Sequence, residues 1–161
     1  MLTALQEAEP IILTCNLTCN ICFADIFERI ESMADPLRAL VVDDIPANRL
    51  VAEEMLSELG WSVMTAVDGR EGLQVLDSAS FDLVVLDISM PGMSGIEMCQ
   101  KIRANNAYTE LPVIAYTAHA QPEDRRNFIA SGFNEVLIKP INRATLVSAV
   151  ASATQHLARN R

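Results

Sequence analysis

The chain of 161 residues is long enough for one ordinary domain with a hydrophobic core and too short for two of full size. Half of its residues are apolar and 20% are charged, and no apolar run reaches the roughly 18 residues that a membrane-spanning helix needs. The formal net charge is −9 and the longest basic cluster is the pair Arg125-Arg126, so we expect neither a nucleic-acid partner nor a membrane partner.

The predicted elements begin at residue 38, from which short β-rich runs alternate with helical runs. Residues 38–42 form a continuous apolar run ended by two aspartates, as expected of a strand that is buried on both faces. Residues 46–60 follow as a helix that begins with a proline and stops at a glycine. Its predicted apolar stripe consists of Val51, Met55 and Leu59.

The same alternation continues to the end of the chain. Four further strands are predicted at residues 61–67, 82–87, 111–116 and 135–138, and four further helices at residues 69–78, 94–105, 121–132 and 142–157. In the last helix Leu146, Val150, Ala153 and Leu157 share one face. Five consecutive βα units predict an α/β fold, with a parallel five-stranded sheet covered by helices on both faces.

Polar residues end or follow four of the predicted strands: Asp43 and Asp44, Asp87, Thr117 and Lys139. Ligands of open parallel sheets bind at the carboxyl ends of the strands, so we expect these residues to converge on one crevice. Any one of them alone would be an ordinary turn or capping residue. Three carboxylates together repel one another unless a cation is present, and Mg²⁺ is the hard cation that such oxygen ligands suit. With a lysine and a hydroxyl beside them, the acids are equipped to accept a phosphoryl group.

Four segments carry a family resemblance. In this order and spacing, LVVDDIPANR, DLVVLDISMPGMSGIEM, VIAYTA and VLIKPI resemble the response-regulator receiver domain of two-component and phosphorelay signalling, most of all the receivers of hybrid kinases. The resemblance implies a flavodoxin-like, doubly wound sheet of strand order 2-1-3-4-5. We therefore expect residues 1–36 to be an N-terminal extension and residues 37–161 to form a receiver domain.

The resemblance also implies roles for the acids. Asp87 would be the phosphoacceptor, which becomes an aspartylphosphate. Asp44 would bind Mg²⁺ directly and Asp43 mainly through water. Asp87 and the backbone carbonyl of Ser89 would complete the protein's share of the metal ligands.

Two further residues would form the phosphoryl-binding switch. Thr117 would donate its hydroxyl to a phosphoryl oxygen, and Lys139 would pair first with the acceptor carboxylate and then with the phosphoryl group. The peptide bond before Pro140 is expected to be cis. Gly92 and Gly95 would give the loop after the acceptor its backbone freedom.

Phosphorylation is expected to pull the ends of the fourth and fifth strands and to bias the helix faces beside them. Three positions before the lysine, where the family usually has an aromatic residue, this chain has Val136. We expect a phosphoacceptor rather than an enzyme, supplied by a histidine kinase or a histidine phosphotransfer protein and acting on an unidentified target protein. Two alternatives stay open: a phosphorylation-independent adaptor with the same fold and a phosphate sink in a phosphorelay.

Cys15, Cys19 and Cys22 stand at the spacing CxxxCxxC, which resembles the iron–sulfur loop of radical-SAM enzymes. That chemistry needs a full or partial barrel of roughly 200 residues or more, for which the chain has no room beside a receiver. A zinc site with a donated fourth ligand is a lesser alternative. The third interpretation is an accidental spacing.

The segment before the receiver leaves two interpretations open. Its first ten residues contain no Lys or Arg, unlike a signal peptide, so we expect a cytoplasmic protein with reduced cysteines. Because Met33 reads as a natural receiver start, residues 1–32 are either a mobile extension or the product of an upstream start assignment. Only four residues follow Leu157, so we expect a stand-alone receiver.

Four other residues with chemical potential have ordinary explanations. We expect Cys99 and Trp61 to be packing residues of the core. His119 and His156 lie in no recognisable phosphodonor sequence, and we expect both at the surface. The phosphodonor must then be another molecule.

Overall fold

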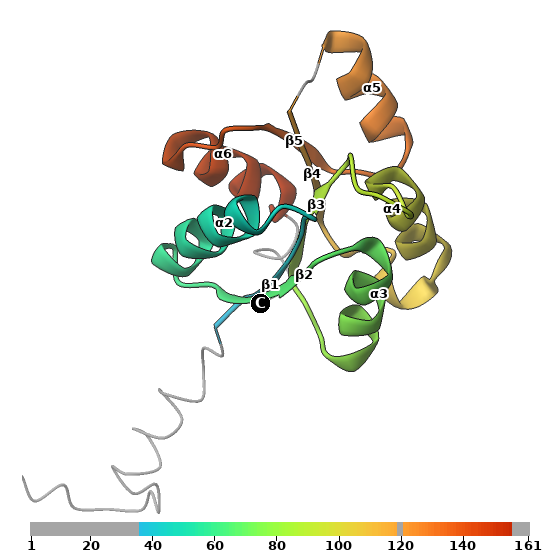
Figure 1. The fold of residues 1–161 in the computed structure, drawn as a ribbon, viewed down its shortest axis with the longest axis horizontal. Helices are drawn as coiled ribbons and strands as arrows, with labels where there is room; N and C mark the ends of the chain where they lie inside the picture. The colour runs from blue at the N-terminus through green and yellow to red at the C-terminus, as the bar shows by residue number, and fades with distance from the viewer. Residues whose placement is uncertain (1–35, 119–120, 156–161) are drawn as a thin grey trace, which may run out of the picture. The chain divides into compact units, whose positions relative to one another are not determined.

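Five short strands form one sheet in the computed structural model, which describes residues 36–118 and 121–155 (Figure 1). They are β1 (Arg38–Val42), β2 (Ser62–Ala66), β3 (Leu83–Asp87), β4 (Val113–Thr117) and β5 (Glu135–Ile138). Every neighbouring pair is parallel, and the strand order is β2-β1-β3-β4-β5. The predicted α/β fold class and strand order are confirmed.

The composition of each strand reflects its place in the sheet. β3 and β4 lie inside the sheet, and all five residues of each are buried. β2 and β5 are the edge strands, and each exposes residues to solvent, such as Ser62 and Ile138. The continuous apolar runs of the sequence therefore mark interior strands, because a strand between two helix layers has no solvent-facing side.

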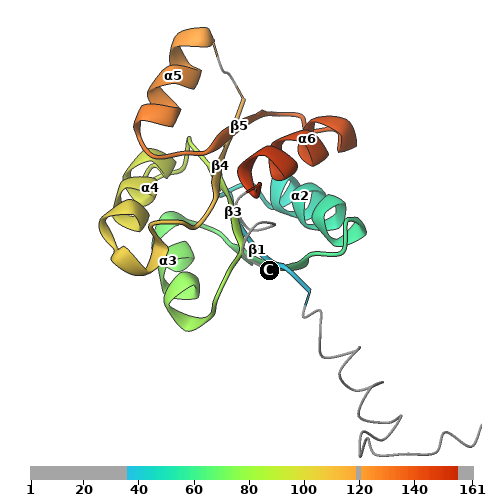
Figure 2. The ribbon, with the colours of Figure 1, turned by 180° about the vertical axis from the view of Figure 1, so that it is seen from behind.

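Helices cover both faces of the sheet (Figures 1 and 2). One face carries α2 (Pro46–Glu58) and α6 (Arg143–Ala153), and the other carries α3 (Gly69–Ser78), α4 (Gly95–Ala104) and α5 (Pro122–Ala130). A short 3-10 helix, η1 (Asn106–Tyr108), lies between α4 and β4 in the chain. Within the described ranges, every helix is too short or too polar to cross a bilayer.

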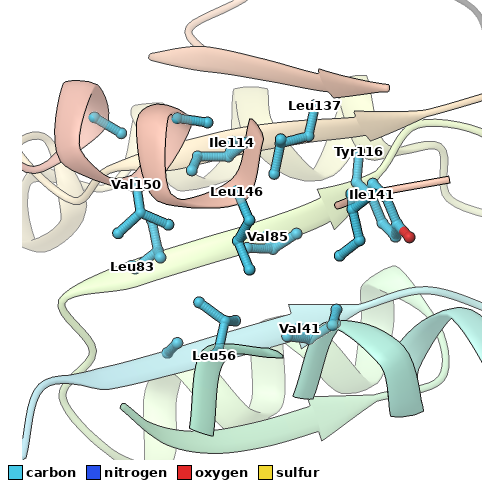
Figure 3. Packing of buried hydrophobic residues seen from close by; sticks show 14 of the residues in the cluster. Val41, Leu56, Leu83, Val85, Ile114, Tyr116, Leu137, Ile141, Leu146 and Val150 are labelled. Carbon is cyan, nitrogen blue, oxygen red and sulfur yellow. The ribbon is translucent and has the colours of Figure 1, made fainter. Parts of the chain in front are cut away.

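Each face of the sheet has its own apolar core. The α2/α6 core joins buried residues of β1, β3, β4 and β5 to those of α2 and α6, and Figure 3 shows how these side chains interdigitate. The α3/α4/α5 core lies on the opposite face. Successive strand residues point to opposite faces, so Val41 and Val85 belong to the first core while Val42 and Val84 belong to the second.

The buried face of α2 differs in part from the predicted stripe. Ala52 and Leu56 are buried, Met55 and Leu59 pack half-buried beside them, and Val51 is exposed. At about 100° per residue, the four packed side chains span an arc of about 100° around the helix, and Val51 lies about 40° beyond the edge of this arc. The prediction was therefore wrong for Val51.

The other helix boundaries lie within two residues of their predicted positions, except that α6 ends at Ala153, before the predicted end at residue 157. Gly60 and Gly132, beyond the ends of α2 and α5, have φ angles of 86° and 105°, which an L side chain rarely adopts. In α6 the buried residues include Leu146, Val150 and Ala153, as predicted. Position 157, predicted on the same face, lies outside the described residues.

Arg103, near the end of α4, joins segments that are distant in sequence. Its guanidinium donates hydrogen bonds to the carbonyl oxygens of Tyr108, Leu111 and Gly132, at 3.1, 2.9 and 2.8 Å. It also donates to Oδ1 of Asn134 at 2.9 Å. These hydrogen bonds could not be predicted from the sequence, because a basic residue near a helix end is usually solvated or faces the helix dipole.

Replacing Arg103 with alanine is expected to lower the free energy of unfolding by about 2 kcal/mol, because hydrogen bonds from a charged donor contribute ~1.5–3 kcal/mol. Urea denaturation followed by circular dichroism measures the change. Arg126→Ala, at an exposed position of α5, is the matched control and is expected to change this free energy by less than about 0.5 kcal/mol. Equal losses in the two variants would contradict the prediction.

Candidate functional site

The polar strand-end residues converge at one edge of the sheet. Val41 and Val85 point into the α2/α6 core, and the side-chain alternation places Asp43 and Asp87, each two residues further along, on the same side. Lys139 follows directly after β5 and reaches both acids. Residues from three strand ends, up to 96 positions apart, thus form one cluster.

The centre of the cluster is a shared ion pair. Nζ of Lys139 lies 2.7 Å from Oδ2 of Asp43 and 2.9 Å from Oδ1 of Asp87. The side chains of Asp43 and Asp87 are 0% and 4% exposed, and that of Lys139 is 14% exposed. Little solvent separates these charges, so the ammonium is the main counter-charge that the described residues offer to both acids.

Asp43 is held by a second set of donors that sequence reasoning missed. Its Oδ1 accepts hydrogen bonds from the backbone N–H of Ile45 at 2.8 Å and from Nδ2 of Asn48 at 3.1 Å. Nη1 of Arg49 donates to the backbone carbonyl oxygen of Asp43 at 2.5 Å. Asn48 and Arg49 lie in the first turn of α2, directly after the acids, and that position was the only signal in the sequence.

The three predicted acids can share a cation. Asp43, Asp44 and Asp87 each offer one carboxylate oxygen, and these oxygens lie within 4.8 Å of one another. Three carboxylates against the one ammonium of Lys139 leave a formal charge of −2 (three minus one). Hard oxygen donors in this number, with a double negative charge to balance, fit Mg²⁺.

Thr117 and Lys139 are tied together through the backbone. Thr117 ends β4 and is 5% exposed. The backbone N–H of Lys139 donates to the carbonyl oxygen of Thr117 at 2.7 Å. The peptide bond between Lys139 and Pro140 is cis. The hydrogen bond between Lys139 and Thr117 keeps the ends of β4 and β5 in register up to the cluster.

The loop after Asp87 approaches the site closely. Ser89 lies exposed on this loop, and Gly92 has a φ of 80°, which explains a glycine there. Gly95 has a different reason: a β-carbon at this position would overlap the carbonyl oxygen of Asp87. The expected need for backbone freedom at Gly95 is thus corrected to a need for space, as the first turn of α4 packs on the end of β3.

The family pattern has an aromatic residue at position 136, where this chain has valine. The aromatic residue beside the cluster is instead Tyr116, on the opposite face of the sheet. Val136 packs half-buried against the α3/α4/α5 core. Tyr116 of β4 is 2% exposed in the α2/α6 core, and Nζ of Lys139 lies 4.5 Å from the centre of its ring. Burial, and then the charges of Asp43 and Asp87, raise the pKa of Tyr116 to about 12, so the phenol stays protonated at neutral pH.

The other candidates fall outside the cluster. Cys99 is fully buried in the α3/α4/α5 core, and burial raises the pKa of its thiol to about 11. Trp61 is buried in the α2/α6 core, so both expectations of packing are confirmed. The predicted sites at positions 15, 19 and 22 and the histidines at 119 and 156 lie outside the described residues.

Sequence comparison gives the same family over most of the chain. A model of the response regulator receiver domain matches residues 39–151. Sensor protein GacS of Pseudomonas syringae pv. syringae is 36% identical over 140 residues, which cover 85% of this chain and 15% of GacS. Sensor histidine kinase RcsC of Escherichia coli K12 is 39% identical over 107 residues, which cover 66% of this chain and 11% of RcsC. The chain thus spans only a small part of these curated relatives.

Solved structures give the same result. The chemotaxis protein CheY4 of Vibrio cholerae has a TM-score of 0.70 and 32% identity, over 74% of this chain and 99% of that one. The receiver domain of the sensor histidine kinase PA1611 from Pseudomonas aeruginosa PAO1, solved with a magnesium ion coordinated in its active-site cleft, has a TM-score of 0.68 and 31% identity, over 75% of this chain and 99% of that one. The chain therefore belongs to the response regulator receiver domain family.

Proposed function

We propose that the chain accepts a phosphoryl group on Asp87 while Mg²⁺ is bound in the site. The donor would be a phosphohistidine of a histidine kinase or of a histidine phosphotransfer protein, and the transfer would take place in the cytoplasm. One observation carries the proposal: three carboxylates gather around one ammonium at the strand ends, and two of them are buried against it. The two buried acids and Lys139 carry a formal charge of −1, and the half-buried Asp44 adds another negative charge, so the cluster is costly to fold without a cation. The arrangement therefore suits a cation and phosphoryl site better than a structural core.

Within the cluster, Asp44, Asp87 and the backbone carbonyl of Ser89 would hold Mg²⁺, and Asp43 would act through water. Both oxygens of Asp43 already accept hydrogen bonds from other residues, whereas the half-buried carboxylate of Asp44 makes none with the residues that the structure describes. Mg²⁺, when bound, would supply neutralisation of the charge on the phosphoryl oxygens.

The chain's own residues would align the transfer. An oxygen–phosphorus bond would form at Asp87 while the nitrogen–phosphorus bond of the donor histidine breaks, and the imidazole would leave with the electron pair. Lys139, already in contact with Oδ1 of Asp87, would stay paired with the new phosphoryl group. Thr117, at the end of the neighbouring strand β4, would donate its hydroxyl to a phosphoryl oxygen.

A groove beside β5 is the surface that would change shape when Asp87 is phosphorylated. It has a volume of about 610 Å³ and runs from Lys139 and Pro140 to Glu135, between β5 and α6. At its far end the carboxylate of Glu135 accepts hydrogen bonds from Arg125 of α5 at 2.6 Å and from Ser152 of α6 at 2.7 Å. A movement of Lys139 would alter one wall of this groove, and we propose that a target protein reads it.

We propose that residues 37–161 form the receiver domain and that residues 1–36 are an extension before it. The relatives carry their receivers within far longer proteins, of which this chain spans 9 to 17%. Several of these relatives are sensor histidine kinases by name, which supports a phosphohistidine as the donor.

The test uses acetyl phosphate and intact-protein mass spectrometry. Wild-type protein with Mg²⁺ is expected to gain one phosphate, and protein treated with EDTA to gain none within the same time, because the carboxylate cluster repels a phosphoryl donor unless a cation balances it. Borohydride reduction converts the acyl phosphate to the alcohol of homoserine and releases the phosphate, and peptide mapping then locates the converted residue. Homoserine at any position other than 87 would refute the proposal.

A phosphorylation-independent adaptor is the second candidate, favoured by the half-buried Val136 in place of an aromatic residue. Its partners would bind equally well before and after treatment with acetyl phosphate, whereas the partners of a switch would not. A pull-down from the same lysate with both forms separates the two functions.

A further inference from the structure

We propose that Tyr116 is a positioning residue, whose ring holds the ammonium of Lys139 between Asp43 and Asp87 and thereby sets how fast Asp87 accepts a phosphoryl group. The inference rests on the proposed function and adds to it a residue of the α2/α6 core. Tyr116 touches the lysine and would touch neither the donor nor the phosphoryl group, so its effect would be exerted through Lys139.

The strand register brings the ring to this place. Tyr116 of β4 is the register partner of Asp87 of β3, and paired residues of parallel strands point to the same face. Tyr116 is also the outermost residue that β4 contributes to the α2/α6 core, where Figure 3 shows it at the end of the cluster beside Ile141. The ring therefore lies between the α2/α6 core and the charged cluster, and its face contacts the ammonium of Lys139.

The contact with the ammonium has the geometry of a cation–π interaction. Nζ of Lys139 lies 4.5 Å from the centre of the Tyr116 ring, within the roughly 6 Å at which such contacts act. The ammonium donates a hydrogen bond to Asp43 and forms an ion pair with Asp87. The negative face of the ring is its third favourable neighbour, and the ring is almost fully shielded from water, which strengthens the attraction.

The lysine needs such a support because its stem is flexible. Four methylene groups separate its ammonium from the backbone, and each adds a rotatable bond. The ammonium pairs with two carboxylates before phosphorylation and would pair with the phosphoryl group afterwards. A contact with the ring that is present in both states would keep it in place. Ile114, two residues earlier in β4, packs in the same core with an aliphatic side chain, so packing alone does not require an aromatic residue in this strand.

The experiment replaces Tyr116 with phenylalanine and then with phenylalanines that carry one, two and three ring fluorines. Fluorine withdraws charge from the ring face and hardly changes its volume. Phosphorylation by acetyl phosphate and Mg²⁺ is expected to stay within about twofold of wild type for Tyr116→Phe and to slow stepwise with each fluorine. It is expected to be about tenfold slower for Tyr116→Leu, because leucine removes the cation–π contact altogether.

The same fluorine series at Phe133 is the matched control, because this ring is equally buried but lies in the α3/α4/α5 core. Its rates are expected to stay constant. A flat series at Tyr116, or parallel declines at the two positions, would overturn the inference while leaving Asp87 as the acceptor. If wild-type protein gains no phosphate at all, the proposed function itself fails.

A second measurement reads the position of Lys139 without metal or phosphate. A ring beneath the ammonium shifts the ε-methylene protons of the lysine upfield in the proton NMR spectrum. The shift is expected in wild type and Tyr116→Phe and absent in Tyr116→Leu, with the signal identified by its loss in Lys139→Arg. Unshifted ε-protons in wild type would overturn the inference regardless of any kinetic result.

Discussion

Asp87→Asn protein is expected to gain no phosphate from acetyl phosphate and Mg²⁺ under conditions in which the wild type gains one. The amide cannot form the acyl phosphate, and no neighbouring acid occupies its place: Asp43 is engaged by three donors and Asp44 lies outside the β3 register. Intact-protein mass spectrometry measures the difference, with a loss of at least about 100-fold expected for removal of the attacking group.

The matched control is Asp77→Asn, an exposed aspartate on α3. It is expected to be phosphorylated at the wild-type rate. The Asn variant at 87 is expected to fold, because it keeps the volume of the side chain and leaves Lys139 paired with Asp43. Undiminished labelling of a folded Asp87→Asn protein would mean that the acceptor lies elsewhere in the chain.

Lys139→Met is expected to have the second largest effect, on both stability and phosphorylation. Without the ammonium, Asp43 and Asp87 become a buried acid pair with no counter-charge, and breaking such a pair typically costs ~3–5 kcal/mol. Metal-free variant protein is therefore expected to lose about 3 kcal/mol of unfolding free energy, as measured by urea denaturation.

Millimolar Mg²⁺ is expected to restore part of that loss, because a cation that binds only the folded state stabilises it. Phosphorylation with Mg²⁺ is expected to be about 100-fold slower, the scale of losing one preorganised charge at a transferred group. Lys101→Met, on the exposed surface of α4, is the control for both measurements. If metal-free Lys139→Met and Lys101→Met proteins have equal unfolding free energies, the ion pair does not stabilise the fold as predicted.

The fold and the acids of the site were predictable because they obey local rules. The apolar runs that become β3 and β4 and the acids at the ends of β1 and β3 can be read from neighbouring residues alone. Parallel pairing then requires Asp43 and Asp87 to meet, whatever the details of packing. Val51 was misplaced because a stripe of every fourth residue drifts around a helix, and only the sheet decides where the buried arc begins.

The supporting residues could not be predicted because their roles depend on partners distant in the chain. Arg103 reaches Gly132 and Asn134 across 29 and 31 positions, and Tyr116 acquires a role only when Lys139 lies above its ring. Asn48 was nearer to its partner, five positions from Asp43, yet an asparagine in a first helical turn has several ordinary explanations. Sequence patterns thus identify the charged groups better than the residues that orient them.

The strand order also fixes when the charges of the site meet during synthesis. All three acids belong to the ends of β1 and β3, which pair with each other, and both strands leave the ribosome well before β5. Domains generally fold as units, and a partial sheet without β5 would gather three like charges with nothing to balance them, so we expect the sheet to form only once β5 is available. Lys139 arrives with the last strand, and completion of the sheet and neutralisation of the acids are therefore one event.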